Sequence, residues 1–327
     1  MQIDNVIIIG AGAWGTAIAT LAASNCDNVV LLANSLELAA EINTEHVNRK
    51  HLPGIAISKR VKAVSRLAPE DVRQAGLIFV ATPASAVAPA IADLLQLPLH
   101  DDAGLIVCSK GLAYHHNEAK FFSQLHKESS FSHLHYAALS GPNFASEVAQ
   151  QVPTRSTIAS RAPGFSARVK NVLVNDHFNM DLTDDPLNAE ICGVYKNVIA
   201  IGCGITDGLA LGGNAAAAVV VQGLRDILVL CKAMNTCADL CGPAGFGDIF
   251  LTCAFPQSRN NAFGRALVEG TANEQKTVEG IGAIRGLSLL AKKLGVQLKL
   301  CQAVHSVVQH QMSKCEIKRL MSNLIVS

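Results

Sequence analysis

The sequence carries little charge and almost no excess of either sign. Only 16% of its 327 residues are Asp, Glu, Lys or Arg, and 27 basic residues against 26 acidic ones give a net charge of +1. No global field therefore attracts nucleic acid or an anionic bilayer, and we expect no nucleic-acid partner. Half of the residues are apolar, which excludes intrinsic disorder and is enough to form a buried core. The length of 327 residues favours two domains.

Long uninterrupted apolar runs are also missing. Mean hydropathy is +0.29. No stretch, however, approaches the roughly 18 consecutive apolar residues that a spanning helix needs. We therefore assign the apolar residues to a core and expect no stable membrane insertion. The apolar stretch Val6 to Ile9 is too short for a signal-peptide core, and no basic segment precedes it. We expect a cytoplasmic location.

Cysteine pairs with metal-ligand spacing are absent. The sequence has no CxxC pair and no His at zinc-finger spacing, so its ten cysteines are interpreted as small core residues in a reducing compartment. His115-His116 and His133-x-His135 lie beside no cluster of Cys or carboxylate residues, and we interpret them as solvated surface histidines. We expect no metal site.

The first motif that is present is a glycine-rich turn between an apolar strand and an Ala-rich helix. A β-branched run at 5–9 leads into Gly10-x-Gly12-x-x-Gly15, and good helix formers follow at 16–23. In a dinucleotide-binding crossover the first glycine makes the tight turn, the second admits a pyrophosphate to the backbone N–H groups, and the third permits close helix packing. A lone match is weak, but the strand before it and the helix after it favour a dinucleotide site.

Three further apolar strands are predicted at 29–33, 77–81 and 105–108. Each ends in a turn of Gly, Pro or small polar residues, so their carboxyl ends are expected to line a crevice where open α/β sheets bind ligands. Beyond Asp181 the strand signals fade, and Asp184-Asp185-Pro186 interrupts both patterns.

The chain is therefore predicted to be an α/β protein with an N-terminal Rossmann-like sheet domain followed by an all-α C-terminal domain. The predicted domains are a dinucleotide-binding domain at 1–185 and a helical substrate and catalytic domain at 186–327. Helices are expected in the second domain at 191–201, 214–234, 258–268 and 281–294. Asn214 and Ser258 are the predicted N-caps of two of them.

The end of the second strand leaves the choice of cofactor open. NAD sites usually place Asp or Glu there, and NADP sites place an Arg nearby. Here Ala33-Asn34-Ser35 gives neither signal, and its polar groups suit a ribose diol or a phosphate. Arg60, Lys62 and Arg66 are the candidates for a cation that folding brings near this point. Both NAD and NADP remain candidates.

Two lysines stand out. Lys110, in Ser109-Lys110-Gly111, follows a strand at the carboxyl edge of the sheet, where a lysine is commonly solvated. Lys196 lies in the apolar helical segment 191–201, where an unpaired ammonium is costly to desolvate. It therefore needs an acceptor or a functional cavity, unless its side chain reaches the surface.

A glycine-rich loop at 242–247 ends in a carboxylate. Asp248 is either a helix N-cap or a functional group, and a helix places Thr252 on the same side of the chain. Ser258-Arg259-Asn260 then opens another expected helix. Its guanidinium, amide and free backbone donors are together suited to a phosphate, although three residues alone are a weak signal.

These segments resemble, in order and over nearly the whole chain, the bacterial type of NAD(P)-dependent glycerol-3-phosphate dehydrogenase. Any one match is compatible with chance, whereas the ordered series is highly specific. The matching segments are residues 10–17, 51–54, 109–111, 140–145, 195–197, 208–214, 245–248 with Thr252, 258–260 and Val278-Glu279-Gly280.

The resemblance implies an oxidoreductase that reversibly reduces dihydroxyacetone phosphate to sn-glycerol 3-phosphate for glycerophospholipid synthesis, and a homodimer is expected. Lys196 resembles the catalytic lysine of the family. Lys110, Asn197, Asp248 and Thr252 resemble its pocket neighbours. The implied substrate contacts are Lys110, Gly141, Arg259 and Asn260, with the last two gripping the phosphate. The implied cofactor contacts are Gly10, Gly12, Ala13, Trp14, Gly15, Asn34, Lys110, Ala145, Arg259 and Glu279.

The sequence departs from the family pattern at two places. The family often has Trp and Arg where this chain has Leu32 and Asn34, which removes a cation expected for NADP. Its Arg-Gly-Leu and Glu-Met pattern becomes Gln222-Gly-Leu-Arg-Asp-Ile227, with consequences for helix packing or a dimer surface. Two alternative functions stay open at this point. One is a related hydroxyacid or sugar-acid dehydrogenase, and the other is a nucleotide sensor without turnover.

Overall fold

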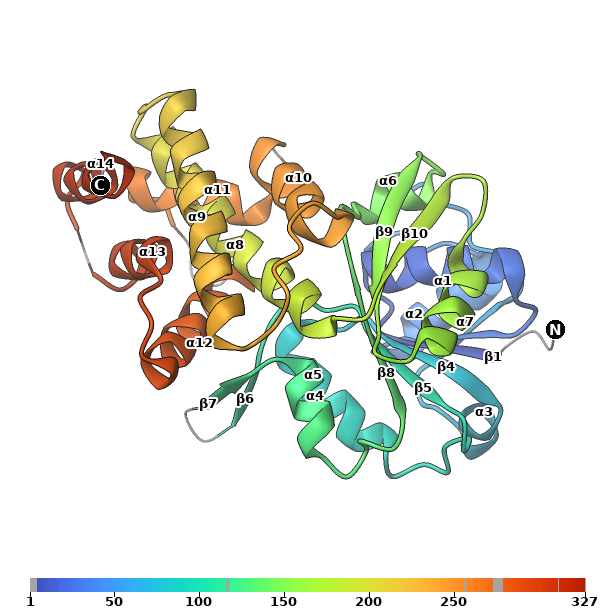
Figure 1. Ribbon diagram of the computed structural model, residues 1–327. Coiled ribbons are helices and arrows are strands. Elements are labelled where there is room, and N and C mark those ends of the chain that lie inside the picture. The colour runs from blue at the N-terminus through green and yellow to red at the C-terminus, as the bar shows by residue number, and fades with distance from the viewer. Residues whose placement is uncertain (1–4, 116–117, 256, 273–278, 311, 327) are drawn as a thin grey trace. The chain divides into compact units, whose positions relative to one another are not determined.

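The computed structural model describes residues 5–115, 118–255, 257–272, 279–310 and 312–326. Contacts divide the chain into two compact units. The first is formed by residues 1–109 and 122–186, and the second by residues 110–121 and 187–327 (Figure 1). Each unit has its own buried apolar cluster, so each is described by itself.

The first unit is built on an eight-stranded sheet with the order β10-β9-β8-β5-β4-β1-β2-β3. All neighbours pair in parallel except β8 and β9, which are antiparallel. This parallel-dominated sheet confirms the predicted Rossmann-like fold. The strands are β1 (Asn5–Ile9), β2 (Val29–Leu32), β3 (Val61–Val64), β4 (Ala75–Val80), β5 (Gly104–Val107), β8 (His135–Ser140), β9 (Thr154–Ala159) and β10 (Phe178–Thr183).

Helices cover both faces of this sheet (Figure 1). On one face α1 packs against α6 and α7, and α4 and α5 lie on the other. Strands β1 and β4 are buried along almost their whole length, because a sheet covered on both faces exposes neither side of its central strands. The helices are α1 (Ala13–Asn25), α2 (Leu36–Glu45), α3 (Pro69–Arg73), α4 (Ala84–Leu94), α5 (Phe122–Glu128), α6 (Ala145–Ala149) and α7 (Pro163–Leu173).

The four predicted strands are present as β1, β2, β4 and β5, with ends within two residues of the prediction. Strands β3, β8, β9 and β10 were not predicted. In β3 and β10 buried and exposed side chains alternate in part, so these edge strands lack the continuous apolar run that marked the central ones.

The second unit is helical apart from one short hairpin, β6 (Ala113–His115) with β7 (Glu118–Lys120). Every secondary-structure element in the described residues from 186 onward is a helix, which confirms the helical C-terminal half. The elements are α8 (Pro186–Gly208), α9 (Gly213–Ala233), the π-helical turn η1 (Pro243–Gly247), α10 (Asp248–Ala254), α11 (Arg259–Glu269), α12 (Glu279–Leu294), α13 (Lys299–Gln309) and α14 (Lys314–Val326).

Helix α8 is the central element of the second unit. Its apolar side chains are buried almost completely, and it crosses α11 at glycines. A Cβ at Gly264 of α11 would lie 2.2 Å from the backbone oxygen of Ile201, and a Cβ at Gly204 would lie 2.0 Å from that of Asn261. The two backbones therefore approach as closely as they do only because these positions lack side chains.

The two predicted N-caps have different outcomes. Ser258 caps α11 and accepts a hydrogen bond from the N–H of Asn261, as predicted. The prediction for Asn214 is wrong, because α9 begins at Gly213 and Gly212 is its N-cap. Gly212 has a φ of +84°, a conformation that favours glycine and turns the chain into the helix one residue earlier than expected.

Helix α9 is long and apolar enough to cross a membrane by length and composition, a test that core helices of globular proteins also pass. It buries Val219, Ile227 and Leu230 in the second cluster. Asp226, also buried, accepts hydrogen bonds from Tyr195 Oη at 2.5 Å and from backbone N–H groups at the start of α13. The departure at 222–227 therefore contributes to helix packing inside the second unit.

Candidate active site

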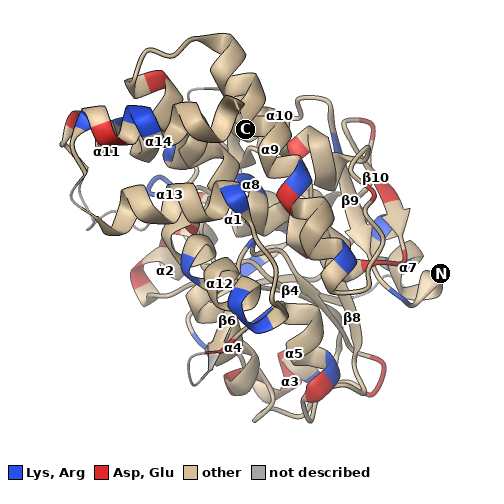
Figure 2. Ribbon diagram, turned by 60° about the vertical axis from the view of Figure 1, so that its left-hand side comes forward, with Lys and Arg blue, Asp and Glu red and all other residues tan. Residues whose placement is uncertain are grey.

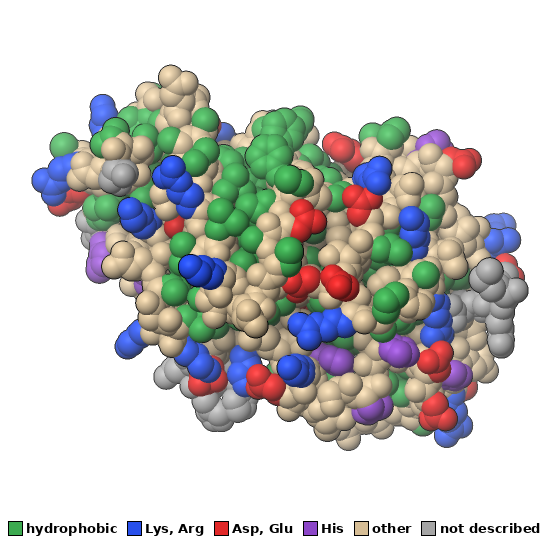
Figure 3. Space-filling model, in the orientation of Figure 1, with side chains coloured by type: hydrophobic (Ala, Val, Ile, Leu, Met, Phe, Trp, Pro, Cys, Tyr) green, Lys and Arg blue, Asp and Glu red, His purple; other side chains and the backbone are tan. Residues whose placement is uncertain are grey.

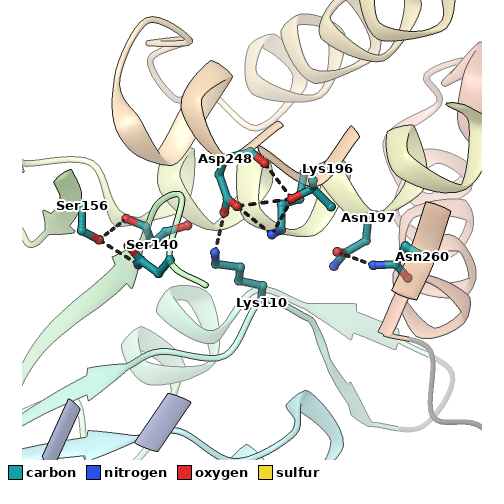
Figure 4. A network of polar contacts seen from close by, with 9 residues as sticks. Lys110, Ser140, Ser156, Lys196, Asn197, Asp248 and Asn260 are labelled. Carbon is teal, nitrogen blue, oxygen red and sulfur yellow. Dashed lines mark hydrogen bonds and ion pairs between the residues drawn. The ribbon is translucent and has the colours of Figure 1, made fainter. Parts of the chain in front are cut away.

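A buried ion cluster joins helices α8 and α10 and the segment at Lys110 in the second unit. Lys196 on α8 donates to Asp248 Oδ1 at 2.7 Å and to Thr252 Oγ1 at 3.0 Å (Figure 4). The Lys196 side chain is 12% exposed and that of Asp248 is 1% exposed. Lys196 therefore does not reach out to solvent but lies in the interior with a carboxylate partner, as a functional lysine would.

Lys110 approaches the same carboxylate from its other side. Its Nζ lies 2.5 Å from Asp248 Oδ2, so one carboxylate bridges two ammonium groups (Figure 4). Burial lowers the pKa of Lys110 to about 8, and the charge of Lys196 acts in the same direction against the attraction of Asp248. A lysine of this kind changes charge close to neutral pH, which is uncommon for a solvated one.

Asp248 is not simply an N-cap. It is the first residue of α10, and its carboxylate binds the two lysines. Burial alone raises the pKa of Asp248, but the two ammonium groups outweigh it and lower that pKa below its usual value. Thr252 lies on the same side of α10, as predicted. It donates its hydroxyl hydrogen to the Asp248 carbonyl at 2.7 Å while accepting from Lys196.

Asn197, the residue after Lys196, has a buried side-chain amide that is only partly hydrogen-bonded within the described residues. Its Oδ1 accepts from Asn260 Nδ2 at 2.8 Å, and Asn260 Oδ1 accepts from the Gly280 N–H at 3.1 Å. The remaining Asn197 Nδ2 has no hydrogen-bond partner among the described residues. Because an unsatisfied buried donor is costly, this amide is suited to a polar ligand beside the lysines.

Arg259 and Glu279 each begin a helix of the second unit. Arg259 is the first residue of α11 and is exposed, and no carboxylate in the described part of the chain pairs with it. Glu279 begins α12, and its charge raises the pKa of Lys110, although burial has the larger and opposite effect. Val278, which belongs to the same sequence segment, lies outside the described residues.

The glycine turn of the first unit has the geometry that its motif predicts. Gly10 has a φ of +110°, and a Cβ there would lie 3.0 Å from the Ala81 carbonyl oxygen. A Cβ at Gly15 would lie 1.8 Å from the Gly10 oxygen, so α1 packs directly on the turn, whereas at Gly12 nothing lies within 4 Å. The open face at Gly12 and the first N–H groups of α1, where Ala13 and Trp14 stand, suit a dinucleotide pyrophosphate.

Asn48 supports this turn and was missed from the sequence. It is fully buried, donates to the Ala11 carbonyl and to Thr16 Oγ1 at 2.9 Å each, and accepts from the His51 N–H. Its position shortly before the segment 51–54 was the available signal. A buried amide that binds a carbonyl of the glycine turn holds that turn in place.

Unpaired polar atoms also gather at strand ends of the first unit. Ser140 Oγ at the end of β8, Thr82 Oγ1 after β4 and Asn143 Oδ1 are buried without a hydrogen-bond partner among the described residues. Gly141 follows with a φ of +149°, and a Cβ there would lie 2.9 Å from Ser156 Oγ. Ser156 Oγ in turn binds the Ser140 carbonyl (Figure 4). Ala145 is the first residue of α6, close behind in the chain.

The three candidate cations near the end of β2 have different partners in the structure. Arg60 pairs with Asp27 and donates to the Ala23 carbonyl, and Lys62 lies 3.6 Å from Asp71. Arg66 lines a pocket with Leu32. Asn34 is exposed after β2, while Ser35 caps α2 by accepting from the Leu38 N–H.

The parallel sheet with an open glycine turn, together with a helical unit that buries two lysines on one carboxylate, defines a nicotinamide-dinucleotide-dependent dehydrogenase. Residues 5–166 match the family model described as the NAD-dependent glycerol-3-phosphate dehydrogenase N-terminus, and residues 185–319 match that of its C-terminus. The chain belongs to the NAD-dependent glycerol-3-phosphate dehydrogenase family. It is therefore an oxidoreductase that uses NAD or NADP and acts on a small phosphorylated substrate.

Curated relatives agree over nearly the full chain. Glycerol-3-phosphate dehydrogenase [NAD(P)+] of Caulobacter vibrioides is 36% identical, covering 94% of this chain and 93% of its own. The enzyme of the same name from Erythrobacter litoralis is 33% identical, covering 97% and 96%. The crystal structure of glycerol-3-phosphate dehydrogenase from Coxiella burnetii has a TM-score of 0.89 at 29% identity and covers 99% of both chains.

Two hydroxyacid-type structures share the fold alone. A ketopantoate reductase from Ralstonia eutropha has a TM-score of 0.56 at 15% identity, covering 98% of this chain and 99% of its own. A D-mandelate dehydrogenase with NADH has a TM-score of 0.60 at 13% identity, with the same coverage. These are weaker matches than the family above, so the glycerol-3-phosphate dehydrogenase assignment is favoured over the hydroxyacid alternative.

Proposed function

We propose that this chain reversibly reduces dihydroxyacetone phosphate to sn-glycerol 3-phosphate with NADH or NADPH, which supplies glycerophospholipid synthesis, and that Lys196 is its catalytic acid. The observation that carries this proposal is the buried cluster of Lys196, Asp248 and Lys110, next to Asn197, whose Nδ2 has no hydrogen-bond partner among the described residues. Its net charge of one positive unit, when both lysines are protonated, is suited to an oxygen that becomes negative during reaction.

The chemistry follows from the charge that develops on the substrate. A reduced nicotinamide dinucleotide, when bound, would supply the hydride that adds to the carbonyl carbon of the ketone. As the carbonyl oxygen gains negative charge, the Lys196 ammonium hydrogen-bonds to it and transfers a proton, which yields the alcohol and leaves a neutral amine. In the reverse direction the neutral amine accepts the alcohol proton.

The neighbours of Lys196 have supporting roles in this step. Asp248 holds the ammonium in place through Oδ1, and Thr252 fixes a second of its donors, so that one N–H remains for the substrate. Lys110 adds positive field at the developing oxyanion. Asn197 Nδ2 supplies a neutral donor to the substrate.

The phosphate of the substrate is assigned to Arg259 and Asn260. A guanidinium is permanently charged and matches phosphate oxygens with two parallel donors, and these residues begin α11, where backbone N–H groups lack helical partners. Gly141 and Lys110 complete the proposed substrate contacts.

The dinucleotide is assigned to the glycine turn and the carboxyl ends of the strands in the first unit. Gly10, Gly12, Ala13, Trp14 and Gly15 are the proposed pyrophosphate contacts. Further proposed contacts are Asn34, Lys110, Ala145, Arg259 and Glu279. We accordingly propose that residues 1–185 are the dinucleotide-binding domain and residues 186–327 the substrate and catalytic domain, with 110–121 packed as part of the second unit.

One assay tests the reaction against both alternatives. Loss of nicotinamide absorbance is followed with dihydroxyacetone phosphate, ketopantoate and phenylglyoxylate as substrates, with each of NADH and NADPH. We expect turnover with dihydroxyacetone phosphate and none above background with the keto acids. Preference for a keto acid would point to a hydroxyacid dehydrogenase, and nucleotide binding without any turnover would point to a sensor.

Phosphate recognition has its own test. Arg259→Ala is expected to raise KM for dihydroxyacetone phosphate by about a hundredfold. The increase in KM should be far smaller for unphosphorylated dihydroxyacetone, which has no phosphate for Arg259 to bind. Arg265→Ala is the matched control on the same helix, because Arg265 pairs with Asp207 instead. Equal losses with both substrates would reject the assignment of Arg259.

A homodimer and a cytoplasmic location complete the proposal. Exposed apolar side chains gather over α9 and α10 (Figure 3), including Val221, Leu228 and Phe250, and such surfaces commonly mark protein contacts. Light scattering on the eluting protein is expected to give twice the chain mass of 34.4 kDa.

Charges of both signs are interspersed over both units (Figure 2), which supports the absence of a nucleic-acid partner.

A further inference from the structure

The carboxyl end of β2 has no charged side chain to choose between the two cofactors, but its neighbour in the sheet supplies one. Strands β2 and β3 pair in parallel with Leu32 opposite Val64, and the Ala33 N–H donates to the Val64 carbonyl at 2.8 Å. The segments that follow β2 and β3 therefore leave the same edge of the sheet in register. Asn34 and Arg66 thus each stand two residues beyond a paired position, on adjacent segments.

A pocket of about 440 Å³ lies at this edge of the first unit. Its lining includes the apolar side chains Ile9, Leu32, Leu67 and Leu94, together with Arg66 and Asp93. Ile9 and Leu32 are the last residues of β1 and β2, the strands on either side of the α1 crossover that carries the glycine turn. Its volume falls within the roughly 300 to 1,000 Å³ typical of small-ligand pockets, and its apolar walls suit an adenine ring.

Arg66 differs from the other cations nearby in its surroundings. Arg60 and Lys62 are both held by carboxylates, whereas no described carboxylate forms an ion pair with the exposed Arg66. Asp93 on α4 is the other charged residue of the pocket, and it pairs with no cation in the described part of the chain. The pocket therefore offers one available guanidinium and one opposing carboxylate.

We propose that this pocket holds the adenosine of the dinucleotide and that Arg66 is the residue that binds the 2′-phosphate of NADPH. Arg66 thereby replaces the cation that the end of β2 lacks, while Asp93 limits the advantage by repelling the same phosphate. This inference rests on the proposed use of a nicotinamide dinucleotide. It adds the residue that sets how well the phosphorylated form is accepted.

The test uses two adenosine fragments that differ only in the 2′-phosphate. Calorimetric titration of the full chain with adenosine 2′,5′-bisphosphate and with 5′-AMP should give about tenfold tighter binding of the bisphosphate. Arg66→Ala should remove this difference and leave the Kd for 5′-AMP unchanged. The difference should also shrink as salt is raised, because Arg66 is exposed.

Matched variants make the result specific. Lys62→Ala, on the same strand-and-turn segment but paired with Asp71, should keep the tenfold difference. Asp93→Asn should enlarge it. Ala90→Trp, which fills the pocket from α4, should weaken binding of both fragments. In turnover assays Arg66→Ala should lower kcat/KM for NADPH about tenfold and spare NADH.

Three results would overturn the inference. These are a bisphosphate preference that survives Arg66→Ala, an equal loss for both fragments in that variant, and no binding of either fragment to the parent chain at millimolar concentration. These experiments measure binding and not turnover, so their outcome does not depend on whether the proposed reaction is correct. A chain that shows this selectivity without reducing dihydroxyacetone phosphate would contradict the reaction alone, and a reductase indifferent to Arg66 would contradict this inference alone.

Discussion

Lys196, Asp248 and Lys110 are three buried ionisable side chains whose charges depend on one another. A lysine ammonium buried without a partner would lose its proton, and a buried carboxylate would gain one. Here Lys196 and Lys110 each form an ion pair with Asp248, which lies between the two ammonium groups. The arrangement keeps a protonated amine in a desolvated place, as a proton donor requires.

Lys196→Met is expected to lower kcat for dihydroxyacetone phosphate by about 10²- to 10⁴-fold, because the variant keeps the packing of the side chain and loses its proton. Steady-state assays on protein with an unchanged melting temperature provide the measurement. Lys292→Met, an exposed lysine on α12, serves as the control and should keep full activity. Near-parental turnover by Lys196→Met would remove this residue from the mechanism.

The pKa of about 8 at Lys110 predicts an alkaline limb in the pH profile. Lys110 is charged below this pKa and loses its charge as pH rises through it, so kcat/KM for reduction should fall above about pH 8. Asp248 raises the pKa of Lys110, so Asp248→Asn should move the limb to lower pH in addition to lowering the rate. Glu279→Gln removes a weaker field of the same sign and should give a smaller shift in the same direction. A limb that stays in place in Asp248→Asn would contradict the coupling.

At the scale of elements, the site depends on how closely two helices approach. Asn197 on α8 meets Asn260 on α11 because Gly204 and Gly264 let the two backbones touch. Similarly, Asp226 on α9 binds the start of α13 and Tyr195 on α8, which ties three helices around the residue that precedes Lys196. Helix contacts thus position the amide and the lysine together.

Gly264→Ala is expected to destabilise the protein by about 1 to 3 kcal/mol and to raise KM for dihydroxyacetone phosphate. The new Cβ would lie 2.2 Å from the Ile201 oxygen, so α11 must move away and carry Asn260 with it. Urea unfolding and steady-state kinetics measure the two effects. Gly282→Ala on α12 is the control, because its nearest neighbour would be the Tyr114 hydroxyl at 4.0 Å and Ala is the better helix former. A Gly264→Ala variant as stable as the parent would show that the helices have room to spare.

At the scale of the whole molecule, the near balance of charge leaves cofactor choice to local contacts. With a net charge of +1 no long-range field favours the more negative NADPH. The end of β2 contributes only neutral groups at Asn34 and Ser35. In the described part of the chain, no strongly placed charge therefore rejects either nucleotide.

We expect both cofactors to be accepted, with kcat/KM values for NADH and NADPH that differ by less than about a hundredfold. A single exposed cation such as Arg66, opposed by Asp93, is compatible with this range. The measurement is kcat/KM for both nucleotides at one ionic strength. A ratio above about a thousandfold in either direction would contradict this assignment of charged residues around the adenosine.

The sequence by itself determined the features that depend on neighbours along the chain. Continuous apolar runs marked the central strands, the Gly10 to Gly15 spacing marked the turn, and Ser258 marked the start of α11, because strand burial, tight turns and helix caps are local requirements. Edge strands such as β3, the earlier start of α9 at Gly213 and the burial of Asn48 were not predicted. These depend on what covers each residue after folding.

Only the tertiary structure decided which residues meet across the chain. Lys110, Lys196 and Asp248 are separated by up to 138 positions, and no periodicity predicts that one carboxylate binds both ammonium groups. The same holds for Arg66, whose place beside β2 follows from strand pairing and not from its distance along the chain. Charge pairing and desolvation act through space, so the pKa of a lysine and the partner of an arginine are fixed only when the fold brings distant segments together.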